Sequence, residues 1–249
     1  MTDASIGRVV GLWRFPVKSM SGCPERGLEI DRNGVRGDRG FAVRDLSTGV
    51  VLSHDSAPLL LHVAVRSGGA DQPPELLIPG RVEWLHAPEA RAALSTYLAR
   101  EVEVVERAAL RAELSFDYGL PVRNEPDQGF GDVAAVVHVV STASIAWLNE
   151  RDNNARVPRP NLVLDVGDVA FREHTWVGQR IVIGDAVLVV TEVTERCSLL
   201  NQSQPGLAAD PENLRRVQTE TGGGLGVYAS IQHAGSLRLG ESVAIRSAT

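Results

Sequence analysis

Residues 180–193, Arg-Ile-Val-Ile-Gly-Asp-Ala-Val-Leu-Val-Val-Thr-Glu-Val, carry the strongest structural signal in the chain. Two runs of apolar, mostly β-branched residues, 181–183 and 187–190, flank the pair Gly184-Asp185. A glycine-containing pair between two strand-forming runs is typical of the two-residue turn of a β-hairpin. The stretch therefore predicts two antiparallel strands joined by a tight turn.

Short strand-like runs of the same kind recur on both sides of this hairpin. They cover residues 6–17, 28–30, 41–44, 50–52, 60–65, 75–78, 102–105, 134–140, 161–166, 225–231 and 242–245. Helices are expected at about 88–100, at 141–151 and from Asp210 onward. Closely spaced strands with few helices do not give the alternating pattern of a parallel sheet, and closing an antiparallel sheet removes its exposed edges. The sequence predicts a mainly β protein built from antiparallel β-barrels with a few short helices.

The composition is that of an ordinary folded protein. Of the 249 residues, 43% are hydrophobic and 22% are charged, which argues against a disordered chain. The formal net charge of −6 disfavours nucleic acid as a partner, because nucleic-acid-binding proteins are usually basic. The longest apolar stretch, residues 58–65, is too short to cross a membrane, and the first residues do not resemble a signal peptide. We therefore expect a cytoplasmic protein that binds neither nucleic acid nor membrane.

The cysteine and histidine content limits the metal chemistry of the chain. Cys23 and Cys197 are too few for a disulfide framework, a four-cysteine zinc site or an iron–sulfur cluster. The six histidines are scattered without metal-ligand spacing, so zinc-dependent hydrolysis is not expected. The glycines of residues 222–226 match no phosphate-binding motif and predict a flexible loop.

Cys197 is the residue with the clearest chemical potential. It follows the predicted strand 187–190 and stands beside Arg196. A neighbouring guanidinium favours the thiolate over the thiol, and the thiolate is the form that ligates soft metals or acts as a nucleophile. The competing interpretation is a small, buried hydrophobic residue. The residues by themselves leave both interpretations open.

Cationic residues recur where predicted strands begin or end. Lys18 and Ser19 follow the first strand, Arg39 precedes another, and Arg156 and Arg159 bracket a proline-containing turn. A strand end holds side chains rigidly, and pre-organised guanidinium groups favour anion binding through paired hydrogen bonds. Each of these residues also has the plainer interpretation of a solvated surface residue. Each of these groups alone is a weak indication of anion binding.

Taken in order, these segments resemble the MOSC family, named for the C-terminal domain of molybdenum cofactor sulfurase, and the N-terminal β-barrel domain that often precedes it. The resemblance is carried by Phe15-Pro16-Val17-Lys18-Ser19, Gly37-Asp38-Arg39 with Phe41, Ser144–Asn149, Arg159-Pro160-Asn161-Leu162-Val163, Glu173-His174-Thr175-Trp176, Ile183-Gly184, Arg196-Cys197 and Gly226-Val227-Tyr228. It implies an N-terminal β-barrel domain over residues 1–110, packed on a MOSC β-barrel over residues 111–249. The polar, turn-rich residues 111–131 are then a linker or an active-site loop.

Within that family the chain is most similar to the bacterial and mitochondrial amidoxime-reducing proteins. In those proteins one cysteine ligates the molybdenum of a pyranopterin cofactor, and the resemblance assigns this role to Cys197. It also implies that Lys18, Ser19 and Arg39 hold the cofactor phosphate and that Arg159 and Asn161 contact the pterin. A thiolate is a suitable soft ligand for such a metal.

The leading hypothesis is a molybdenum-cofactor-dependent oxidoreductase that reduces N-hydroxylated or N-oxide small molecules by removing oxygen. Because the chain has too few cysteines for an iron–sulfur cluster, electrons would come from a separate donor protein. The first alternative is a sulfur carrier or sulfurtransferase that uses a persulfide on Cys197. The second alternative is a non-catalytic module that binds an anionic cofactor.

Overall fold

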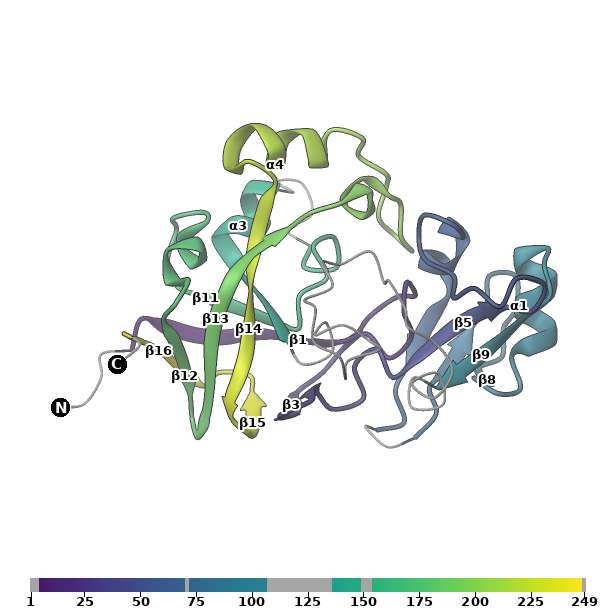
Figure 1. Cartoon of the computed structure of the whole chain (residues 1–249), viewed down its shortest axis with the longest axis horizontal. Coiled ribbons are helices and arrows are strands. Elements are labelled where there is room, and N and C mark those ends of the chain that lie inside the picture. Colours follow the sequence, from purple (N-terminus) through teal and green to yellow (C-terminus); the bar gives the residue numbers. More distant parts are fainter. Residues whose placement is uncertain (1–4, 70–71, 107–135, 149–153, 248–249) are drawn as a thin grey trace.

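The protein is described from a computed structural model, which covers residues 5–69, 72–106, 136–148 and 154–247. A closed β-barrel of seven strands dominates the C-terminal half (Figure 1). Its strands follow the order β11-β10-β14-β13-β12-β16-β1, and β1 pairs back on β11. In chain order they are β1 (Gly7–Arg14), β10 (Val136–Ser141), β11 (Leu162–Asp165), β12 (Arg180–Ile183), β13 (Ala186–Glu195), β14 (Gly224–His233) and β16 (Ser242–Arg246).

The hairpin predicted at residues 180–193 is confirmed as β12 and β13. Ile183 pairs with Ala186 and Ile181 with Leu188, so the turn is formed by two residues. Gly184 adopts a φ of +54°, in the left-handed region that a glycine enters without steric penalty. β13 continues past the turn and pairs along most of its length with β14. These two long antiparallel strands form one side of the barrel (Figure 1).

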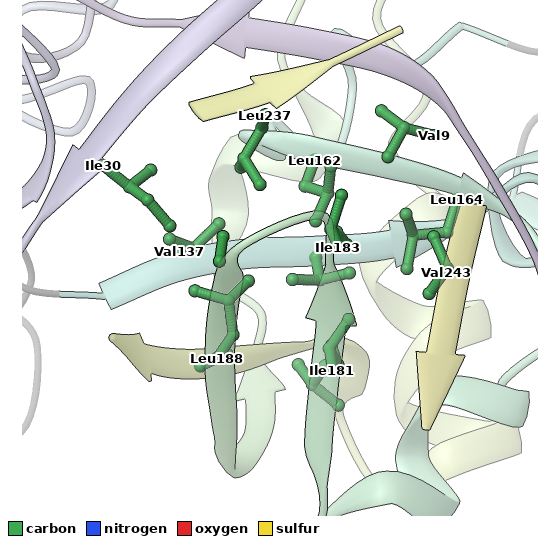
Figure 2. Packing of buried hydrophobic residues seen from close by; sticks show 14 of the residues in the cluster. Val9, Ile30, Val137, Leu162, Leu164, Ile181, Ile183, Leu188, Leu237 and Val243 are labelled. Atoms are coloured by element: carbon green, nitrogen blue, oxygen red, sulfur yellow. The ribbon is translucent and has the colours of Figure 1, made fainter. Parts of the chain in front are cut away.

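The first residues of the chain belong to the barrel formed by its C-terminal half. β1 pairs with β11 on one side and with β16 on the other. The short β2 (Cys23–Pro24) extends β1, and β3 (Gly27–Asp31) pairs with both β15 (Gly235–Arg238) and β4 (Gly34–Val35). Figure 2 shows the resulting core, to which β1, β3, β15 and the barrel strands contribute side chains; the labelled ones are Val9, Ile30, Val137, Leu162, Leu164, Ile181, Ile183, Leu188, Leu237 and Val243.

The remaining N-terminal residues form two small sheets with a second apolar core. One sheet pairs β5 (Phe41–Asp45) with β9 (Val102–Glu106), and the other contains β6 (Ala64–Arg66), β7 (Glu75–Leu77) and β8 (Leu85–His86). Helix α1 (Arg91–Leu98) packs on this part. On the barrel, α3 (Thr142–Leu148) and α4 (Asn213–Thr221) lie together at one end (Figure 1).

The structure confirms the predicted mainly β architecture and corrects it in detail. β10 and β11 are parallel, whereas the other strand pairs of the barrel are antiparallel. The strand predicted at residues 60–65 is wrong in its first half, where the 3-10 helix η1 (Pro58–His62) precedes β6. A short apolar run fits a buried helical turn as well as a strand, and Pro58 favours the helical start.

Residues 111–131, predicted to be a linker or active-site loop, lie outside the described residues. The domain division at 110/111 falls in the same gap and stays a prediction. Within the described ranges, helices are too short or too polar to span a bilayer.

Candidate functional site

Cys197 lies where the long strand β13 ends. The N–H of Arg196 donates to Gly223 O over 3.0 Å, and Cys197 then precedes the 3-10 helix η4 (Ser198–Asn201). The thiol of Cys197 is exposed. The alternative of a small hydrophobic residue packed in the core is therefore wrong for this position.

The turn after β1 carries two of the predicted cofactor-binding residues, Lys18 and Ser19. The backbone N–H of Lys18 donates to Phe41 O over 2.9 Å, which fastens the turn to the start of β5. Lys18 is half-buried and Ser19 is buried. The Ser19 hydroxyl accepts a hydrogen bond from the backbone N–H of His54 over 3.0 Å, so it holds the loop that precedes η1. Its own proton remains available to donate to a further acceptor.

Strained backbone coincides with three predicted cofactor-binding residues. Ser19, Arg39 and Arg159 have φ values of 63°, 49° and 57°. Non-glycine residues rarely adopt this left-handed conformation, which costs on the order of 1–2 kcal/mol per residue. Among the described residues, just two other non-glycine residues have positive φ. Because such strain tends to persist at functional sites, its location supports a site at these three residues.

Arg39 and Arg159 meet at the ring of Phe15. Their guanidinium carbons lie 5.2 Å and 4.2 Å from the ring centroid. Arg39 also pairs with the carboxylate of Asp38, and Arg159 Nη2 donates to Met20 O over 2.7 Å. Two cations that are far apart in the sequence are thus brought to one place.

Arg196 adds a third guanidinium to this cluster. Its Nη2 donates to Pro158 O over 2.8 Å, next to Arg159 in the chain. Burial lowers the pKa of Arg196, and the charge of Arg39 lowers it further. The neighbouring Tyr228 and Cys197 oppose this shift. Burial and the charges of Arg39 and Arg196 lower the pKa of Arg159 to about 9, against the opposing effect of Asp38. These three cations destabilise one another, so the site favours an anion.

Unpaired N–H groups point to the same conclusion. Arg159 Nη1 and Arg196 Nε are buried and have no hydrogen-bond partner among the described residues. A buried donor without a partner is costly, because water and protein both fail to solvate it. An anionic ligand would supply the missing acceptors.

His54 comes from the N-terminal part and contacts Cys197. Its Nε2 lies 3.6 Å from Cys197 Sγ, and the adjacent Asp55 accepts the hydroxyl of Ser198 over 2.8 Å. Burial lowers the pKa of His54; Asp55 opposes this shift, and the charges of Arg159 and Lys18 add to it. Sequence reasoning missed His54, because its contact with Cys197 depends on how the two parts of the chain pack.

Asn161 is buried inside the framework. Its Oδ1 accepts the N–H of His138 and its Nδ2 donates to Trp13 O, both over 3.2 Å. The side-chain amide therefore joins β10 to β1. Its predicted contact with a pterin stays a prediction.

The arginines singled out by the sequence separate into two groups. Arg39 and Arg159 are at the Phe15 ring, whereas Arg36 is exposed and Arg156 Nη1 donates to Pro205 O over 2.8 Å. The glycine-rich segment lies beside the cluster, and Arg196 is fastened to its Gly223. The candidate site thus consists of Lys18, Ser19, Arg39, Arg159, Arg196, Cys197 and His54.

The fold and this site define a β-barrel protein with an exposed thiol next to a cationic cluster. Family models for the MOSC domain and the MOSC N-terminal beta barrel domain match residues 126–244 and 6–84. The chain therefore belongs to the family of MOSC domain-containing proteins, which associates it broadly with the molybdenum cofactor.

Comparison with solved structures gives distant similarities. The YUAD protein from Bacillus subtilis is 14% identical, with a TM-score of 0.48 over 98% of this chain and 97% of that chain. YiiM from Geobacillus stearothermophilus is 20% identical, with a TM-score of 0.34 over 44% of this chain and 53% of that chain. No curated protein matches the chain.

The residues present fit a molybdenum–pyranopterin cofactor. A polyanionic ligand would satisfy the unpaired donors of Arg159 and Arg196, and the exposed sulfur of Cys197 is a soft ligand. Groups of three or more His, Cys, Asp or Glu side chains that would suit another metal site are absent from the described ranges. The donors present thus suit one protein sulfur together with an anionic organic group.

Proposed function

We propose that this protein is a molybdenum-cofactor-dependent oxidoreductase that reduces N-hydroxylated or N-oxide small molecules by removing oxygen. The observation that carries the proposal is the exposed thiol of Cys197 beside three guanidinium groups, two of which have buried, unpaired N–H donors. When bound, the cofactor would supply the two-electron chemistry. Electrons would come from a separate donor protein.

The chain's own residues would anchor and orient the cofactor. Cys197 would provide the sulfur ligand, and Arg39, Arg159 and Arg196 would neutralise its phosphate and polar edges. Lys18 and the hydroxyl of Ser19 lie in a turn fastened to β5, which would fix the phosphate end. The left-handed backbone at Ser19, Arg39 and Arg159 supports a functional role for these positions.

Metal and pterin analysis tests the proposal. Protein purified from cells with intact cofactor synthesis is expected to contain molybdenum and pterin in stoichiometric amounts. Cys197→Ser should lose the molybdenum, while its free energy of unfolding changes by less than about 0.5 kcal/mol because the side chain is exposed. Cys23→Ser, at a buried cysteine whose Sγ donates to Val65 O, should keep the molybdenum bound to the folded fraction. Wild-type protein without molybdenum and pterin contradicts the proposal.

A sulfur carrier is the second candidate, and the contact between His54 and Cys197 is the observation that favours it. An imidazole 3.6 Å from a thiol can take its proton and so activate sulfur as a nucleophile. Mass spectrometry of purified protein distinguishes the two candidates. A reducible gain of one sulfur atom on Cys197, without molybdenum, would favour the carrier.

The proposed setting is the cytoplasm. Both cysteines are free, which fits a reducing compartment. The proposed partners are a small-molecule substrate and an electron-donor protein, without nucleic acid.

A further inference from the structure

Phe15 is a fully buried, purely apolar side chain at the centre of a cationic cluster. Its exposed fraction is 0%, and the guanidinium carbons of Arg159 and Arg39 lie over its ring at 4.2 Å and 5.2 Å from the centroid. Cations within about 6 Å of an aromatic centroid are attracted to the negative face of the ring. An aliphatic side chain of similar size would offer no such attraction.

The two arginines need this attraction because they repel each other. Burial, and to a smaller extent the charge of Arg39, lower the pKa of Arg159. Two like charges held over one buried ring repel each other. Asp38 pairs with Arg39 and acts on Arg159 through its charge, but within the described ranges Arg159 forms no salt bridge with a carboxylate. The ring therefore adds to the effect of Asp38 on Arg159, which has no carboxylate in direct contact.

The position of the ring is fixed by its surroundings. The N–H of Phe15 donates to Asp38 Oδ1 over 2.6 Å, and its carbonyl accepts the N–H of Arg39 over 2.7 Å. On the ring side, a Cβ added at Gly22 would lie 2.4 Å from Phe15 Cε1, so a side chain there would push the ring away. Phe15 is thus tied to Arg39 through the backbone and to Arg159 through its ring.

We propose that Phe15 is a positioning residue for anion binding, whose ring holds Arg39 and Arg159 together so that both act on one phosphate-type group. This inference deepens the proposed function, because the cofactor carries such a group. It assigns no contact between Phe15 and the ligand. The stabilisation is lost when the ring is removed, even if an apolar side chain fills the same volume.

Binding of inorganic pyrophosphate to the cofactor-free full chain, measured by calorimetry at fixed ionic strength, tests this role. Phe15→Leu is expected to bind about thirtyfold more weakly than wild type, the size of a desolvated cation–π interaction. Phe15→Tyr keeps the ring and should bind within about threefold of wild type. Phe171→Leu is the matched control: this ring packs on Trp147 at 4.8 Å, and its loss should leave pyrophosphate affinity unchanged.

A series of fluorinated phenylalanines at position 15 separates the ring's charge distribution from its shape. Each added fluorine weakens the negative face of the ring while the side chain stays nearly the same size. Pyrophosphate affinity should fall step by step with the number of fluorines. This series remains informative if Phe15→Leu does not fold.

The outcomes separate this inference from the proposed function. Equal affinity across the fluorinated series, or wild-type protein that does not bind pyrophosphate, overturns the role of Phe15. A stepwise decrease in wild-type-like folded protein supports it, even if purified protein lacks molybdenum. Molybdenum-loaded wild type with a flat series would uphold the proposed function and refute this inference.

Discussion

Exposure separates the two cysteines at the scale of single residues. Cys23 is buried and its Sγ donates to Val65 O over 3.0 Å, whereas Cys197 is exposed. Burial, with a smaller effect from Glu25, raises the pKa of Cys23 to about 11. The same functional group is therefore unreactive at one position and accessible at the other.

Alkylation of the native protein tests this difference. With cofactor-free protein at pH 8, iodoacetamide should modify Cys197 and leave Cys23 unmodified, because only about one Cys23 thiol in a thousand is ionised at that pH. Peptide mass spectrometry identifies the labelled residue. In denaturant both cysteines should react, which serves as the control. Rapid labelling of Cys23 in folded protein would show that this thiol is accessible and not buried.

Gly226 is a second residue whose identity the structure explains. It has a φ of +76°, and a Cβ there would lie 2.6 Å from Val140 Cγ2 and 2.7 Å from His138 Nε2. Gly226→Ala therefore combines backbone strain with a steric clash and should destabilise the fold by about 3 kcal/mol or more.

Gly178→Ala is the matched control for this substitution. Gly178 has a similar φ of +81°, but nothing lies within 4 Å of the added Cβ. Its cost should be near 1 kcal/mol, from backbone strain without a clash. Urea unfolding of both variants gives the comparison. Equal destabilisation would mean that the strands around Gly226 adjust to the methyl group.

At the scale of elements, His138 connects the strands that meet beneath the site. On β10, its Nδ1 lies 3.3 Å from Arg159 O and its Nε2 lies 3.4 Å from Leu225 O, at the start of β14. A neutral imidazole has one N–H and can donate to one of these carbonyls. Burial, with the charges of Arg196 and Arg39, lowers the pKa of His138 well below its ordinary value. The folded state thus keeps His138 neutral.

This shift gives stability a definite pH dependence. Below about pH 6.5 the unfolded chain binds a proton at His138 that the folded chain does not bind, so stability decreases as pH falls. The slope is at most about 1.4 kcal/mol per pH unit for this one group. In His138→Gln the slope should be smaller, although His54 and His174, whose pKa values are also lowered by burial, still contribute.

Urea unfolding at several pH values checks this expectation. His233 is exposed, so His233→Gln should keep the wild-type slope. An unchanged slope in His138→Gln would mean that His138 is protonated in the folded protein.

Strands with a clear apolar pattern could be predicted, whereas their distant pairing partners could not. The β12–β13 hairpin was predictable, because both strands and their turn lie within residues 180–193. β15 was not predicted: its four residues are stabilised by pairing with β3, some two hundred residues earlier in the chain. The apolar residues of η1 were assigned to a strand because a short buried run has no distinguishing period.

In the candidate site, too, the residues that lie in local motifs could be predicted and their distant contacts could not. Motif resemblance selected Lys18, Ser19, Arg39, Arg159 and Cys197, since each lies in a short segment with a recognisable pattern. The contact of His54 with Cys197 and the position of two guanidiniums over Phe15 arise only from packing. Asn161 was selected for a pterin contact, yet its amide bonds to the protein's own backbone. Sequence patterns therefore identified residue types better than their partners.

At the scale of the whole molecule, the described residues before 107 and those after 135 depend on each other for their structure. β1 closes the barrel between β11 and β16, and β3 pairs with β15. Beside the site, Arg159 bonds to Met20, Ser198 to Asp55, and His62 Nε2 lies 3.2 Å from Ser203 Oγ. The site is assembled only when both parts are in place.

Separate expression of residues 1–110 and 111–249 tests this dependence. Without β1 and β3, the fragment 111–249 has unpaired edges on β11, β16 and β15, and its core lacks Val9, Leu12, Leu28 and Ile30. It should show no cooperative unfolding transition, because exposed edges and an incomplete core leave the barrel unstable. Co-expressed halves should purify together and regain a cooperative transition. Intact protein with a protease site inserted between residues 110 and 111, cut after folding, controls for the chain break and should stay assembled. A fragment 111–249 that unfolds cooperatively by itself, at the denaturant midpoint of the full chain, would show that the barrel closes without the N-terminal strand.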